Sequence, residues 1–182
     1  MKEHKTYTTA GAFRRALEER LKKTSQTDQT DINRLRRQVS FDRLLARLFR
    51  DDSVPWVLKG GYALELRFKT ARSTVDIDLT MGRMEDATDS SDVNRVVREI
   101  LQAAASLPLG DWFEYTIGSP MMDITAAPYG GARYPVEVRM DGRISESSTS
   151  TQASEILSFI RWRSSKRAIG SHSQESNGRK CD

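Results

Sequence analysis

Residues 74–80, Thr-Val-Asp-Ile-Asp-Leu-Thr, alternate polar and apolar side chains and constrain the fold more than any other segment of this chain. Such alternation predicts a half-buried strand whose apolar residues face the core, while Asp76 and Asp78 share the opposite face. Two carboxylates about 6–7 Å apart on one strand face repel each other unless a cation lies between them. Mg²⁺ is the natural partner, since it prefers oxygen ligands and bridges to substrate phosphates. The alternative is two exposed aspartates on an amphipathic strand.

A second motif precedes this strand. Residues 55–58 are apolar enough to predict a short buried strand, and they lead directly into Lys59-Gly60-Gly61 and a helix over residues 62–68. Glycines between a strand and a helix allow backbone N–H groups to approach an anion at the positive end of the helix dipole. Lys59 would add a cation beside bound phosphates. Considered alone, the same three residues also fit a plain tight turn.

Helical periodicity predicts three further helices. The first begins at a Thr8 or Thr9 cap, the second begins near Thr30 or Asp31, and the third spans Val93 to Ala104. Residues 112–117 and 134–140 are typical of strands. The second helix carries five arginines opposite its apolar stripe, and they form either a solvated face or an RNA-facing patch: Arg34, Arg36, Arg37, Arg43 and Arg47.

Charge is distributed unevenly along the chain. Residues 1–50 hold 13 basic and 6 acidic residues, whereas residues 51–144 hold 10 basic and 15 acidic residues. A basic N-terminal segment followed by an acidic central segment is typical of a protein that holds a polyanion near a metal site. The alternative interpretation is that the basic residues form the solvated surface of helices. A single cysteine and two histidines exclude a disulfide framework and a zinc cluster. The sequence has no signal peptide and no apolar run that could span a bilayer, so we expect a soluble, cytoplasmic protein without membrane contact.

Together, the two motifs are more specific than either alone. The string VLKGGYALELRFKTARSTVDIDL resembles the AbiEii-type nucleotidyltransferases, the toxin components of type IV toxin–antitoxin (abortive infection) systems, within the polymerase-beta-like superfamily. The resemblance covers residues 7–144 and extends to Gly130-Gly131-Ala132-Arg133-Tyr134 ahead of the last predicted strand. It implies an α+β nucleotidyltransferase fold, with a small mixed sheet flanked by helices, that is truncated on its C-terminal side.

The resemblance also implies a function and a set of site residues. A toxin of this family would use Mg²⁺ and a nucleoside triphosphate to attach nucleotides to an acceptor such as tRNA, and a cognate antitoxin would be its partner. The carried-over roles are metal binding and catalysis for Asp76 and Asp78, and nucleotide or phosphate binding for Lys59, Gly60, Gly61, Arg72 and Thr74. Glu137 is a candidate third carboxylate, or a solvent-facing strand residue.

We divide the chain into a helical lead-in (1–52), a nucleotidyltransferase core (53–144) and a serine-rich tail (145–182). Eleven serines occupy the last 38 residues, against eight in the preceding 144. The tail is either a genuine disordered segment or the product of translation past a single-nucleotide slip, and we favour the slip. A shifted frame after Ile144 permits the Phe-His-Leu-Asp strand that brings the family's third carboxylate. We therefore expect a dispensable tail and an impaired enzyme; the alternative is a non-catalytic remnant that binds nucleotide, RNA or antitoxin.

Overall fold

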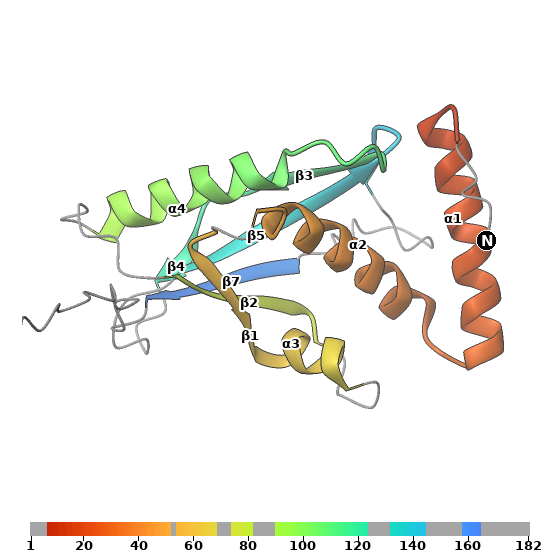
Figure 1. The fold of residues 1–182 in the computed structure, drawn as a ribbon, viewed down its shortest axis with the longest axis horizontal. Helices are drawn as coiled ribbons and strands as arrows, with labels where there is room; N and C mark the ends of the chain where they lie inside the picture. The colour runs from red at the N-terminus through yellow and green to blue at the C-terminus, as the bar shows by residue number, and fades with distance from the viewer. Residues whose placement is uncertain are drawn as a thin grey trace, which may run out of the picture.

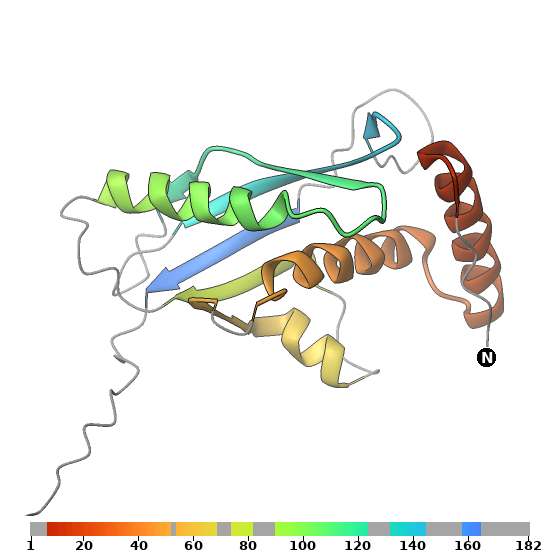
Figure 2. The same cartoon turned by 45° about the horizontal axis from the view of Figure 1, so that its top comes forward.

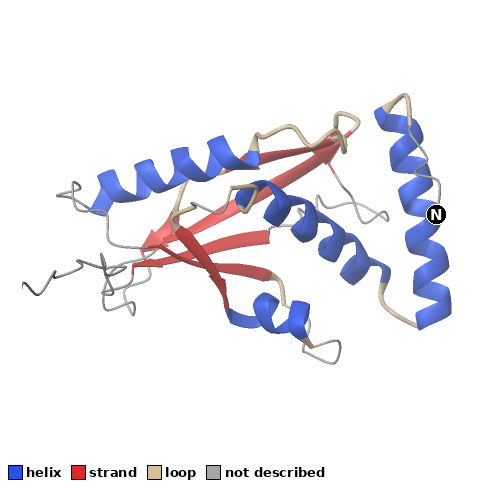
Figure 3. Ribbon diagram, viewed as in Figure 1, coloured by secondary structure: helices blue, strands red, loops and turns tan. Residues whose placement is uncertain are grey.

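The computed structural model describes residues 7–51, 54–68, 74–81, 90–123, 132–144 and 158–164. Within these ranges the chain forms four helices and one seven-stranded sheet, which confirms the α+β class (Figures 1 and 3). None of the described helices is long and apolar enough to cross a membrane. Arg72, the tail beyond Ser164, and the predicted slip after Ile144 lie outside the described residues.

The sheet is mixed and has the strand order β1-β2-β7-β5-β3, with β4 and β6 paired to β5. Only β2 and β7 run parallel; the other described pairs are antiparallel. Figures 1 and 2 show β7 between β2 and β5. The strands are β1 Trp56–Lys59, β2 Asp76–Met81, β3 Phe113–Ile117, β4 Met121–Asp123, β5 Ala132–Met140, β6 Arg143–Ile144 and β7 Ser158–Ser164.

The helices begin close to where the sequence predicts. Thr9 caps α1 by accepting a hydrogen bond from the Ala12 N–H, and Asp31 caps α2 by accepting one from the Arg34 N–H. These contacts satisfy backbone donors that the first helical turn leaves unpaired. Helix α3 begins two residues earlier than predicted. The helices are α1 Ala10–Asp28, α2 Ile32–Leu48, α3 Gly60–Arg67 and α4 Ser90–Ala105.

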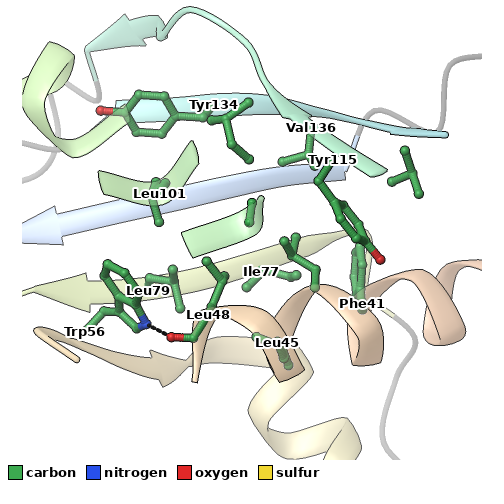
Figure 4. Close-up of a cluster of buried hydrophobic side chains, with 14 of the residues drawn as sticks. Phe41, Leu45, Leu48, Trp56, Ile77, Leu79, Leu101, Tyr115, Tyr134 and Val136 are labelled. Carbon is green, nitrogen blue, oxygen red and sulfur yellow. Dashed lines mark hydrogen bonds between the residues drawn. The ribbon is translucent and has the colours of Figure 1, made fainter. Parts of the chain in front are cut away.

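One hydrophobic core joins α2, α4 and the apolar face of the sheet. Alternate residues of β2 and β5 are buried, and their side chains pack with those of α2 and α4 (Figure 4). Trp56 Nε1 donates a hydrogen bond of 3.0 Å to the Leu48 carbonyl, which fixes β1 against the end of α2. The intervening residues of β2, including Asp76 and Asp78, are half-buried on the opposite face.

Four of the five arginines of α2 form ion pairs with neighbouring elements, so they do not make up a simple solvated face. Arg36 and Arg47 are buried, because acidic residues of neighbouring elements pair with them. The ion pairs of this helix join Arg34 to Glu65, Arg36 to Glu18, and both Arg43 and Arg47 to Asp111. The sequence predicts the apolar stripe of α2, but it does not reveal the acidic partners that bury Arg36 and Arg47.

The expectation of a tail without regular structure is wrong for β7. Residues 158–164 form a strand that pairs with β2 on one side and β5 on the other. The serine-rich surroundings obscured a short alternation in which Ile160 and Trp162 are each followed by an arginine. A segment of this pattern suits a strand position between two others. Because β7 lies inside the sheet, the tail as a whole is not expected to be dispensable.

Candidate active site

The two predicted motifs meet at one corner of the sheet, as expected from the sequence. Strand β1, helix α3 and strand β2 follow one another, and β1 pairs antiparallel with β2 so that Lys59 lies opposite Asp78. Gly60 and Gly61 form the start of α3 directly after Lys59. The lysine, the glycine pair and the strand that carries the aspartates therefore lie next to one another.

The backbone requires glycine at the first position of the turn, and a side chain at the second position would be a tight fit. Gly60 has a φ of +72°, a conformation that L side chains rarely adopt. A Cβ at Gly60 would also lie 2.8 Å from Cγ of Asp78 and closer still to its Oδ2. A Cβ at Gly61 would lie 3.2 Å from Cβ of Thr74. The absence of side chains thus lets the start of α3 contact both Asp78 and Thr74.

Thr74 and Glu65 hold the beginning of β2 against α3. The Thr74 N–H donates to Glu65 Oε2 at 3.2 Å, and the Asp76 N–H donates to Thr74 Oγ1 at 3.4 Å. The Glu65 side chain is only 6% exposed and also accepts hydrogen bonds from Arg34 and Gln38. Thr74 is therefore placed to order the strand that carries both aspartates, in addition to its predicted nucleotide contact.

Arg133 is a site residue to which sequence reasoning gave no role. Its Nη2 lies 3.1 Å from Oδ2 of Asp76, with side-chain exposures of 37% and 14% respectively. Arg133 belongs to β5, which is separated from β2 by β7. The sequence signals for Arg133 are its position in the Gly130–Tyr134 segment that resembles the family and its place before the buried Tyr134 and Val136. Neither signal reveals which carboxylate the arginine reaches.

Basic residues occupy the positions beside Asp78 in the sheet. The strand register places Lys59 of β1 and Arg161 of β7 on either side of Asp78, and Arg133 of β5 next to Arg161. Neighbouring strands are about 4.8 Å apart, so these four positions span about 14 Å. Although residues 51–144 are acidic as a whole, the two aspartates lie among basic positions.

Glu137 does not join Asp76 and Asp78. It pairs with Arg139 at the surface and lies four residues along β5 from Arg133, which corresponds to about 13 Å of strand. Asp141 is also directed elsewhere, since its Oδ2 lies 3.6 Å from Nε of Arg14 in α1. Within the described ranges, no group of three histidine, cysteine, aspartate or glutamate side chains gathers in a way that could hold a metal.

The two aspartates nevertheless suit one divalent cation. They supply hard oxygen donors from alternate positions of one strand face, with Asp78 against the start of α3. Mg²⁺ commonly takes one or two carboxylates and completes its coordination with water and substrate phosphates. The ion pair from Arg133 already neutralises one of the two carboxylates, so binding of a cation at Asp76 would require the guanidinium to move.

Comparison with known proteins identifies the family. No curated protein matches the chain. Residues 43–152 match the family described as "Nucleotidyl transferase AbiEii toxin, Type IV TA system". The match begins near the end of α2, includes β1, α3 and β2, and covers more than half of the 182 residues. The chain therefore belongs to the AbiEii nucleotidyltransferase toxin family of type IV toxin–antitoxin systems.

Proposed function

We propose that this protein is a toxin that transfers nucleotides from a nucleoside triphosphate to an RNA acceptor such as tRNA, with Mg²⁺ as cofactor and an antitoxin as partner. The observation that carries the proposal is the contact between the glycine turn and the aspartate strand. Gly60 lies against Asp78, and Lys59 lies opposite Asp78 in the sheet. The proposed phosphate-binding turn and the two proposed cation ligands therefore lie side by side.

The polymerase-beta-like nucleotidyltransferase fold is part of this proposal. Its support is the local order of elements, in which a strand leads into two glycines and a helix and then into an antiparallel strand bearing Asp76 and Asp78. The helix begins directly at the glycines, so its unpaired N–H groups and its dipole favour negative charge beside the two aspartates.

Each residue of the site has a distinct proposed role. Asp76 and Asp78 would hold Mg²⁺, which when bound would neutralise charge on the triphosphate. Lys59 and the N–H groups at the start of α3 would bind phosphate oxygens. Thr74 holds β2 in position through its contacts with Glu65 and Asp76. Arg72, from its resemblance to the family motif, is a further proposed nucleotide contact.

We expect transfer to be slow in this chain. Displacement at phosphorus is accelerated when cations stabilise both the attacking and the leaving oxygens, and a third carboxylate helps to form the second cation position. In the strand register, Asp76, Asp78 and Thr80 of β2 lie opposite Phe159, Arg161 and Arg163 of β7. None of these three β7 residues is acidic. The neighbouring strand therefore offers no third carboxylate at these three positions.

The test compares triphosphate binding and nucleotide transfer in the full chain and in Asp76→Asn. Each nucleoside triphosphate is titrated with and without Mg²⁺, and transfer to labelled tRNA is measured separately. We expect Mg²⁺ to strengthen triphosphate binding, and Asp76→Asn to reduce that gain on the order of tenfold because one charged ligand is lost. Glu137→Gln, which alters a surface carboxylate on β5, should change neither measurement. Identical triphosphate affinity with and without Mg²⁺ would contradict the two-carboxylate site.

A non-catalytic binding module is the second candidate. It is favoured by the basic register positions around Asp78, which suit a polyanion whether or not transfer follows. Triphosphate or RNA binding without any detectable transfer would support this candidate. RNA affinity that is unchanged by Asp76→Asn, and independent of triphosphate and Mg²⁺, would indicate a simple RNA-binding protein instead.

A further inference from the structure

We propose that Arg133 is the resident counter-ion of the aspartate pair and makes cation binding at Asp76 depend on the arrival of a polyphosphate. The proposal rests on the proposed function, because it assigns an order of events to the same site. In the protein without substrate, Arg133 occupies the Asp76 carboxylate. A polyphosphate then draws the guanidinium away and leaves that carboxylate available to a divalent cation.

The geometry of the ion pair supports this role. Arg133 Nη2 lies 3.1 Å from Asp76 Oδ2, which is within hydrogen-bonding distance. The Asp76 side chain is 14% exposed, whereas that of Arg133 is 37% exposed. The carboxylate is therefore enclosed while the guanidinium remains accessible from solvent. A cation that approaches Asp76 meets a positive charge already in place.

The pair also spans an intervening strand. In the strand register, Arg133 of β5 lies opposite Arg161 of β7, and Arg161 lies opposite Asp78 of β2. The carboxylate that Arg133 contacts belongs to Asp76, which is two residues before Asp78 in β2. Two strand spacings amount to about 10 Å. Only a long side chain that extends across β7 makes this contact. A guanidinium held in this way can turn to a phosphate, with which it forms two parallel charge-assisted hydrogen bonds.

Charge at the site favours the same order of binding. The strand register places three basic residues, Lys59, Arg133 and Arg161, in the same row of the sheet as Asp78. Together with Asp76 and Asp78, the residues at these positions carry a formal charge of +1, since three positive charges exceed two negative ones. A polyanion is attracted to such a centre, whereas a divalent cation alone is repelled. Bound phosphates would reverse the sign and admit the cation.

The experiment measures Mn²⁺ binding to the full chain without nucleotide, using the loss of the free-ion electron paramagnetic resonance signal. Mn²⁺ serves as the probe because it accepts the same oxygen ligands as Mg²⁺. Arg133→Gln should bind Mn²⁺ on the order of tenfold more tightly than the unmodified protein, which is the range for a hydrogen bond between charged groups. The same variant should bind inorganic tripolyphosphate without metal on the order of tenfold more weakly.

Three further variants isolate the pair. Arg139→Gln removes an arginine from the same strand that pairs with Glu137, and it should leave Mn²⁺ affinity unchanged. Arg133→Lys keeps the charge and should remain within about threefold of the unmodified protein. In an Asp76→Asn background, Arg133→Gln should no longer strengthen Mn²⁺ binding, since the two effects depend on one contact.

A spectroscopic measurement on the unmodified chain covers the case in which Arg133→Gln does not fold. The ¹⁵N resonance of Arg133 Nε should shift when tripolyphosphate is added without metal, and an unchanged resonance would overturn the proposal. The counter-ion role would be overturned if Arg133→Gln bound Mn²⁺ with the same affinity as the unmodified protein. If Asp76→Asn still bound Mn²⁺ more weakly than both, the proposed function would remain intact. Absence of Mn²⁺ binding in all variants would overturn both.

Discussion

The backbone conformation of Gly60 brings the start of α3 against Asp78. Its φ of +72° turns the chain from β1 into α3, and the missing side chain leaves room for the Asp78 carboxylate. Both requirements act on the same residue. A substitution here therefore disturbs the turn and the aspartate together.

We expect Gly60→Ala to lower the free energy of unfolding by about 3 kcal/mol, from backbone strain and from overlap with Asp78. Gly110→Ala is the matched control. Gly110 has a similar φ of +65°, but no atom lies within 4 Å of a Cβ placed there, so only the strain of about 1 kcal/mol remains. Chemical denaturation of both variants measures the difference, which reports the contact with Asp78. Equal decreases in the free energy of unfolding for the two variants would show that Asp78 does not contact Gly60 in solution.

Among the elements, α2 depends most on ion pairs that were not predicted. Arg47 is 3% exposed and makes hydrogen bonds to both Asp111 and the Phe113 carbonyl, while its guanidinium lies 5.0 Å from the centre of the Tyr115 ring. Arg43 donates to the same carboxylate. Asp111 therefore ties α2 to the start of β3.

This cluster predicts a pH-dependent stability. Burial by itself raises the pKa of Asp111, but the hydrogen bonds and positive charges of Arg47 and Arg43 outweigh it, so the pKa lies below its usual value of 3.8. A carboxylate with a depressed pKa in the folded state contributes stability above its unfolded pKa and loses that contribution as the pH falls through the folded pKa. We expect Asp111→Asn to cost about 3 kcal/mol at pH 7, because Arg47 stays buried without its partner.

Denaturation of Asp111→Asn and the unmodified protein between pH 2 and pH 7 provides the measurement. The stability difference between the two should stay constant from pH 7 to about pH 5 and shrink below the usual carboxyl pKa. Glu137→Gln is the control, since its surface pair with Arg139 is exposed. A stability difference that is independent of pH across the whole range would argue against a charged Asp111 in the folded state.

At the scale of the whole molecule, β7 joins the two halves of the sheet. On one side lie β1 and β2 with the aspartates, and on the other lie β5 and β3 with Arg133. Strands β2 and β5 each pair with β7, so their connection within the sheet runs through residues 158–164. Residues 158–164 belong to the serine-rich tail that the sequence predicts to be disordered, yet they connect the strand that carries the aspartates to the strand that carries Arg133.

Truncation after Ile144 tests the role of β7 directly. We expect loss of the cooperative thermal transition, or a melting temperature lower by more than 10 °C, because backbone hydrogen bonds of β2 and β5 lose their partners. Truncation after Ser164 keeps β7 and is the matched control, with a transition near that of the full chain. An unchanged transition after truncation at Ile144 would instead favour the original expectation of a dispensable, out-of-frame tail. The nucleotide sequence around codon 144 tests the slip independently.

The sequence by itself determined the local parts of this protein. Strand alternation placed Asp76 and Asp78 on one face, cap residues placed the starts of α1 and α2, and the Lys-Gly-Gly turn placed α3 beside them. These features depend on residues a few positions apart, so short patterns suffice to predict them.

Only the tertiary structure decided the long-range partners. The Arg133–Asp76 pair joins residues 57 positions apart, Arg47 reaches Asp111 across 64 positions, and β7 pairs between two strands from different parts of the chain. An arginine on a helix or strand is charged and long whether it faces water or a carboxylate. Which of the two it meets is set by packing and register, because these bring together residues that no local pattern relates.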